Sequence, residues 1–146
     1  MVSSLELDWI KVTTVTMKDD KLDWPLVSKK LAKTFRQGVY QLRYNGVVIK
    51  NGCFGEGVTK GINRRFSDYR YMSKNLNEVR AGIKQKNGSF NTINILDERL
   101  VLGDTVEVYA VSFPDDIIIN NLPWKVDLYA IEANLKELHK DTIWLI

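Results

Sequence analysis

Cysteine and histidine are almost absent from the sequence. One cysteine, Cys53, and one histidine, His139, occur among 146 residues. A single cysteine excludes an intrachain disulfide and a cysteine-rich metal cluster, and it fits a reducing compartment. A lone histidine near the end of a helix is most often a surface residue that interacts with the helix dipole. We therefore assign His139 no catalytic role.

Long apolar runs and a strong net charge are also missing. No apolar stretch approaches the ~18 residues needed to span a bilayer, and the first residues lack the pattern of a leader. We expect a soluble, cytoplasmic protein that makes no membrane contact. The 21 Lys and Arg oppose 18 Asp and Glu, which leaves a net charge of +3. Any nucleic-acid binding must therefore come from a local basic surface and not from the whole chain.

The chain has the size and composition of one domain. Its 146 residues are 45% hydrophobic, which is enough to bury a continuous core. No repeat, low-complexity tract or linker marks a boundary. We expect a single domain over residues 1–146, in which residues 1–36 form an N-terminal extension packed on the core.

Local patterns predict an α+β fold. Two β-prone runs joined by Asn45-Gly46 are the strongest short-range signal for a hairpin, and residues 105–113 are rich in β-branched and aromatic side chains. Asp127 can cap a closing helix. Amphipathic patterns predict helices at 23–35, 62–72, 76–85 and 128–140. This order of elements indicates an α+β domain with a small, mostly antiparallel sheet.

Residues 37–140 carry a series of motifs in a recognisable order. Gly38-Val39-Tyr40 begins the first hairpin strand, and a glycine-rich stretch follows the second. Gly57 is followed eight positions later by Arg65, with Phe66 and Tyr69 after it. A strand and a helix bearing Glu132 come later. In this order and spacing the chain resembles the GIY-YIG nuclease family, and in particular its small bacteriophage-encoded endonucleases.

The resemblance implies a three-stranded central sheet flanked by helices and a metal-dependent endonuclease that hydrolyses DNA, of phage or bacterial origin. It implies that Arg65 binds the scissile phosphate, since a guanidinium can donate two hydrogen bonds to phosphate. It implies that Glu132 holds Mg²⁺ or Mn²⁺ and that Tyr40 helps to take the proton of the nucleophile. One small site that cuts both strands would need either two copies of the chain, as in a homodimer, or two separate events.

The second motif departs from the family pattern. Family members have Tyr-Ile-Gly or Lys-Ile-Gly, and the positions that match are Gly55, Glu56 and Gly57. A shifted reading over residues 53–55 restores an apolar strand end but loses the spacing to Arg65. Two alternatives to a nuclease therefore stay open. The chain could be a catalytically inactive fold of this kind that binds nucleic acid or a protein, or an unrelated α+β interaction domain.

Basic residues gather in the middle third of the chain, and Lys50 is one of them. Exposed lysines and arginines ordinarily form a solvated face, but a basic face can also neutralise backbone phosphates. We expect the nucleic-acid contacts to come from Lys60, Arg64, Arg70 and Lys74.

Overall fold

The computed structural model describes residues 7–55 and 61–144. Its elements in chain order are β1 (Ile10–Lys18), β2 (Lys21–Asp23), α1 (Lys29–Thr34), β3 (Gly38–Tyr44), β4 (Val47–Phe54), α2 (Ile62–Arg80), α3 (Phe90–Arg99), β5 (Thr105–Ser112), β6 (Asp116–Ile119), β7 (Leu122–Lys125) and α4 (Leu128–Leu138). The α+β class is as predicted. None of the described helices is long and apolar enough to cross a membrane.

The main sheet has five antiparallel strands in the order β2-β1-β5-β3-β4. The expected three-stranded sheet is therefore wrong in its size. β1 pairs along β5, and Val15 and Met17 alternate with less buried residues so that they face the core. Burial on one face explains why the opening segment forms sheet strands although its alternation of apolar and polar residues is imperfect.

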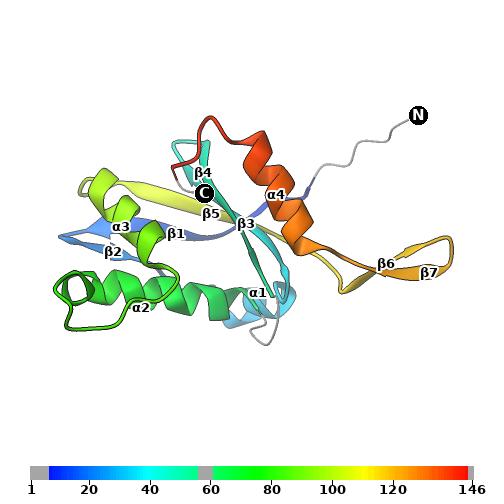
Figure 1. Ribbon diagram of the computed structural model, residues 1–146, viewed down its shortest axis with the longest axis horizontal. Coiled ribbons are helices and arrows are strands. Elements are labelled where there is room, and N and C mark those ends of the chain that lie inside the picture. The colour runs from blue at the N-terminus through cyan, green and yellow to red at the C-terminus, as the bar shows by residue number, and fades with distance from the viewer. Residues whose placement is uncertain (1–6, 56–60, 145–146) are drawn as a thin grey trace.

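Helices cover both faces of this sheet (Figure 1). α2 and α3 pack on one face, where the main core contains Tyr40, Leu42 and Val108 from the strands. α4 packs on the other face, where Leu135 contacts a smaller cluster with Val39. The β6–β7 hairpin projects from the body of the molecule between β5 and α4 (Figure 1).

The hairpin predicted at Asn45-Gly46 is confirmed, since both residues adopt the positive φ angles, 51° and 79°, of a tight turn between strands. The helix predicted at 23–35 is shorter, because Ser28 caps a helix that begins at Lys29. The helices predicted at 62–72 and 76–85 both lie in α2, which is kinked between them at the non-helical residue Asn75, and the second ends at Arg80 and not at residue 85.

The C-terminal segment lies along the outer edge of β4. The backbone N–H of Trp144 donates to the carbonyl of Ile49 at 2.8 Å, and the hydroxyl of Thr142 donates to the carbonyl of Val48 at 2.7 Å. This segment satisfies edge groups that would otherwise be open to another strand.

Candidate active site

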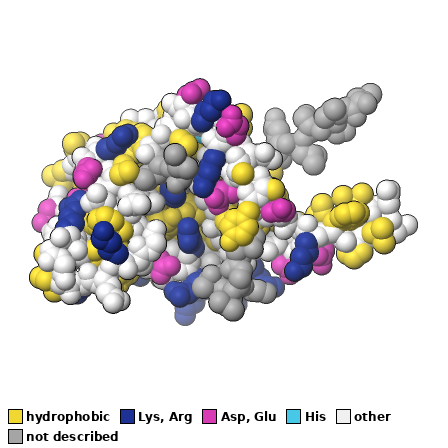
Figure 2. Space-filling view, in the orientation of Figure 1, with side chains coloured by type: hydrophobic (Ala, Val, Ile, Leu, Met, Phe, Trp, Pro, Cys, Tyr) yellow, Lys and Arg dark blue, Asp and Glu magenta, His cyan; other side chains and the backbone are white. Residues whose placement is uncertain are grey.

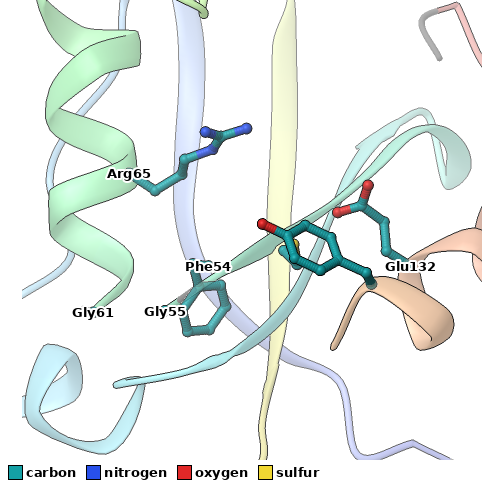
Figure 3. Close-up of a pocket in the computed structure, with 7 residues that line it drawn as sticks. Phe54, Gly55, Gly61, Arg65 and Glu132 are labelled. Carbon is teal, nitrogen blue, oxygen red and sulfur yellow. The ribbon is translucent and has the colours of Figure 1, made fainter. Parts of the chain in front are cut away.

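A polar cavity of about 230 Å³ lies where the end of β4, the start of α2 and the start of α4 meet. Its wall consists of Cys53, Phe54, Gly55, Gly61, Arg65, Tyr129 and Glu132. Figure 3 shows Arg65 extending from α2 and Glu132 extending from α4 toward the same space. The structure thus brings together two residues that the sequence separates widely, and both were predicted to be functional.

Arg65 lies in the first turns of α2 and packs over aromatic rings. The helix begins after Gly61, whose φ of 93° suits glycine. The guanidinium carbon of Arg65 is 5.8 Å from the centre of the Tyr69 ring, which in turn stacks on Trp24 with centroids 4.5 Å apart. Burial works to lower the pKa of Arg65, but the neighbouring phenols of Tyr40 and Tyr69 outweigh it and raise the pKa above its ordinary value. The side chain is therefore a permanent cation at the cavity.

Tyr40 lies beneath this arginine in the core and is fully buried. Its hydroxyl makes a short hydrogen bond with the hydroxyl of Tyr69. Burial raises the pKa of Tyr40 well above the usual value, with Tyr69 adding to the effect and Arg65 opposing it. Gly52 lies opposite Tyr40 on β4, and a Cβ there would overlap the phenol ring. The pair Tyr40 and Gly52 thus lets the ring lie flat across β4, under the cavity.

Glu132 projects from the second turn of α4, and its side chain is 17% exposed. Its carboxylate is 2.7 Å from the ammonium of Lys136, one turn later on the helix. Burial works to raise the pKa of Glu132, but hydrogen bonds from Cys53 and Lys136 outweigh it and hold the pKa below the usual value. The group is therefore an anion at neutral pH.

No group of three or more His, Cys, Asp and Glu side chains that could hold a metal occurs in residues 7–55 and 61–144. A single carboxylate beside a polar cavity still fits Mg²⁺, which keeps several water ligands and often takes only one or two carboxylates from the protein. Glu132 is the residue that would hold it.

Lys50 is a further cation of the site, which the sequence groups only with surface basic residues. It lies on β4 and is 8% exposed. Burial lowers its pKa to about 8, and the nearby charges of Lys136 and Arg65 add to the shift while Glu132 opposes it. In the sequence, the signal for this lysine is its place at the end of an apolar strand, directly before Asn51-Gly52, which reads as a turn.

Asn51 and His139 attach α4 to β4. The side-chain amide of Asn51 donates to the carbonyl of Leu135 at 3.2 Å and lies 3.2 Å from Nδ1 of His139. Asn51 also accepts a hydrogen bond from Gln41 on β3 at 2.9 Å. Since Leu135 follows Glu132 by less than one turn, this network helps to set the position of the carboxylate.

The predicted nucleic-acid contacts are dispersed. Arg64 is exposed and lies 3.7 Å from Asp68. Arg70 and Lys74 are exposed too, but on α2 they lie about 140° and 180° around the helix from Arg65, so they point away from the cavity. Lys60, Glu56 and Gly57 lie outside the described residues, and so does the predicted spacing from Gly57 to Arg65.

A second, basic groove adjoins the cavity at Gly61, which lines both. The groove has a volume of about 410 Å³ and runs between α1 and the start of α2. Its charged residues are Lys29, Lys33, Arg36 and Arg64. The first three were not predicted as contacts, although the lysines of this segment are visible in the sequence as the polar side of an amphipathic helix.

Comparison with known proteins shows the fold of the chain. No family model and no curated protein matches it. Among solved structures, a glutamate-to-alanine mutant of bacteriophage T4 EndoII superposes with a TM-score of 0.59, at 20% identity, over 94% of this chain and 92% of that chain. The restriction endonuclease HPY188I in complex with product DNA gives a TM-score of 0.46 at 16% identity, over 92% and 77%. The chain therefore has the fold of bacteriophage T4 EndoII.

Proposed function

We propose that the protein is a metal-dependent endonuclease of the GIY-YIG type that hydrolyses DNA. The observation that carries the proposal is the convergence of Arg65 and Glu132 on one polar cavity. Its support from outside the chain is the shared fold with bacteriophage T4 EndoII. A phosphodiester in that cavity would meet a fixed cation on one side and a carboxylate on the other.

Arg65 binds the scissile phosphate in this mechanism. Its charge is fixed and its position is set by the Tyr69 ring, so it stabilises the charge that develops on the phosphoryl oxygens. Lys50 adds a second positive charge nearby. Its burial costs free energy in the empty site, and an entering phosphate offsets that cost.

Glu132 would hold Mg²⁺ or Mn²⁺, which supplies Lewis-acid stabilisation of the phosphoryl oxygens and lowers the pKa of bound water. Cys53 and Lys136 keep the carboxylate ionised and oriented. Tyr40 is a neutral phenol at physiological pH because its pKa is raised. Because Tyr40 is fully buried and is not among the residues that line the cavity, its hydroxyl in this proposal positions Arg65 and does not contact the nucleophile itself.

The basic groove gives the DNA backbone a path to the cavity. Lys29, Lys33 and Arg36 present cations on α1, and Gly61 joins their groove to the Arg65 cavity. Backbone phosphates bound in the groove would place the next phosphodiester beside Arg65. Binding by such contacts weakens steeply as salt rises.

The test is nicking of supercoiled plasmid with Mg²⁺, with Mn²⁺ and with chelator. We expect metal-dependent nicking by the unaltered protein and a loss on the order of 100-fold in Arg65→Ala and Glu132→Ala. Glu137→Ala and Arg70→Ala are matched controls on the same two helices, and both should keep most of the activity. If Arg65→Ala and Glu132→Ala nick as fast as the unaltered protein, the site is wrong. Salt-sensitive DNA binding without nicking in any metal would favour the inactive binding protein instead.

A further inference from the structure

The β6–β7 hairpin presents a row of large apolar side chains to solvent. All eight of its strand residues are exposed. Figure 2 shows hydrophobic side chains gathered on this projection. A two-stranded hairpin alone is at best marginally stable in water, and it gains stability from further strands or from packing of its apolar face. The hairpin therefore has the composition of an element that is completed by a partner.

The two faces of the hairpin differ. Cross-strand pairing places Ile117 opposite Trp124 and Ile119 opposite Leu122, so these four side chains share one face. They are 43%, 53%, 48% and 59% exposed respectively. The other face carries Ile118 and Pro123 with the charged pair of Asp116 and Lys125.

The two edges of the hairpin differ as well. The N–H of Val126 donates to the carbonyl of Asp115 at 3.2 Å, so these two residues form a hydrogen-bonded pair. In an antiparallel ladder every second residue forms such a pair, and the backbone groups of Ile117 and Ile119 therefore point toward β7. The backbone groups of Ile118 then point outward from β6. Pro123 occupies the corresponding outward position on β7 and has no N–H, which blocks that edge against another strand. The open edge is that of β6.

The charges of the hairpin do not suit DNA. Asp116 begins β6, and Asp115 and Asp127 flank the hairpin, against one cation, Lys125. An acidic base would repel phosphates, whereas the groups that suit them line the groove at α1. The occupant that fits is a protein strand of matching apolar sequence.

We propose that a second copy of this chain pairs its β6 with this β6 in antiparallel fashion and forms a symmetric dimer. Such an interface uses the same patch on both copies. The register that places Ile118 opposite Ile118 of the second copy also sets Ile117 opposite Ile119 and leaves Asp116 opposite Asn120, so no like charges meet. The result is a four-stranded sheet with the blocked β7 edges outside. This proposal concerns assembly and does not depend on the proposed cleavage.

Sedimentation velocity of the full chain, from nanomolar to high micromolar concentration, tests the proposal. We expect a dimer, and we expect Ile118→Pro to raise its dissociation constant by roughly tenfold or more, because two cross-subunit hydrogen bonds are lost. Ile118→Pro removes only an outward N–H, so it leaves the hydrogen bonds inside the hairpin intact. Ile118→Lys is a second variant, which should also be monomeric.

Leu102→Lys is the matched control, since Leu102 is 69% exposed and Ile118 is 68% exposed. It should remain a dimer. Hydrogen exchange adds a residue-level measurement: the amide of Ile118 should be protected at high protein concentration and unprotected after dilution.

A monomeric unaltered protein at all concentrations overturns the proposal, and so does a dimer that survives both Ile118 variants. Weaker DNA binding by Ile118→Lys with unchanged mass would assign the hairpin to DNA and also overturn it. A dimer that nicks no plasmid would leave this proposal standing and remove only the proposed activity.

Discussion

Replacing Lys50 with methionine should stabilise the protein while it weakens the site. The folded-state pKa of Lys50 is about 8, below the ordinary value of 10.5, because the ammonium is buried beside other cations. Below pH 8 the lysine is charged in the folded and unfolded states, and the full cost of burying the charge is present. Between about pH 8 and 10.5 the folded state loses the proton first, so the cost fades as pH rises. A shift of this size is worth about 3 kcal/mol of unfolding free energy at pH 7.

Methionine has a similar length and no charge, so Lys50→Met should raise the free energy of unfolding by about 3 kcal/mol at pH 7. At pH 9.5 the gain should fall to about 1 kcal/mol. Denaturant unfolding with chelator present measures both values. Lys74→Met, an exposed lysine on α2, is the control and should change stability by less than about 0.5 kcal/mol at either pH.

A gain from Lys50→Met that does not depend on pH would refute the charge-burial argument, because hydrophobic packing alone has no such dependence. Destabilisation at pH 7 would refute it more directly. In the plasmid assay the same variant should nick more slowly than the unaltered protein, since it lacks a cation near the phosphate. Stability and activity would then change in opposite directions, as they often do when a site holds a buried charge.

Two further predictions concern groups around the cavity. Tyr40→Phe and Tyr69→Phe should each lower the free energy of unfolding by about 1–3 kcal/mol, because each removes a hydrogen-bond partner from the other buried hydroxyl. In denaturant unfolding the double variant should lose less than the sum of the two losses, and additive losses would contradict the coupling. Lys33→Glu with Arg36→Glu should weaken DNA binding and flatten its dependence on salt in a titration, with little effect on stability; an unchanged salt dependence would remove the groove from the DNA path.

The parts of the fold that the sequence predicts well are those with strong local signals. Asn45-Gly46 dictates a hairpin because both residues tolerate positive φ, and Asp127 caps α4 by accepting from the N–H of Ala130 at 3.0 Å. Arg65 and Glu132 have no such local signal, so they are predictable as site residues only through motif spacing. No local signal says that α2 and α4 bring them to one cavity.

The β6–β7 hairpin and α3 have weak local signals. β6 and β7 are each four residues long, and Pro123 argues against a strand in isolation. Their turn, Asn120-Asn121, adopts φ angles of 52° and 63°, which asparagine tolerates but does not require. α3 begins after Ser89, whose side chain makes no capping hydrogen bond, so the helix depends on burial of Ile93 and Leu96. These elements depend on packing, which sequence patterns do not show.

The end of β4 shows how one ambiguity of the sequence affects both fold and site. Asn51-Gly52 reads as a turn, yet both residues continue the strand. The amide of Asn51 is satisfied by Gln41 and by Leu135 of α4, and Gly52 provides the space for the Tyr40 ring. These are contacts with other elements of the fold, which a turn at Asn51-Gly52 would not require.

Those same contacts assemble the site. α2 and α4 lie on opposite faces of the sheet, so Arg65 and Glu132 can face one another only around an edge strand, which is β4. Asn51 attaches α4 to that strand, while Gly52 admits the Tyr40 ring that supports Arg65. The residue types that obscure β4 in the sequence are therefore the ones that allow two helices to present their charges to a single cavity.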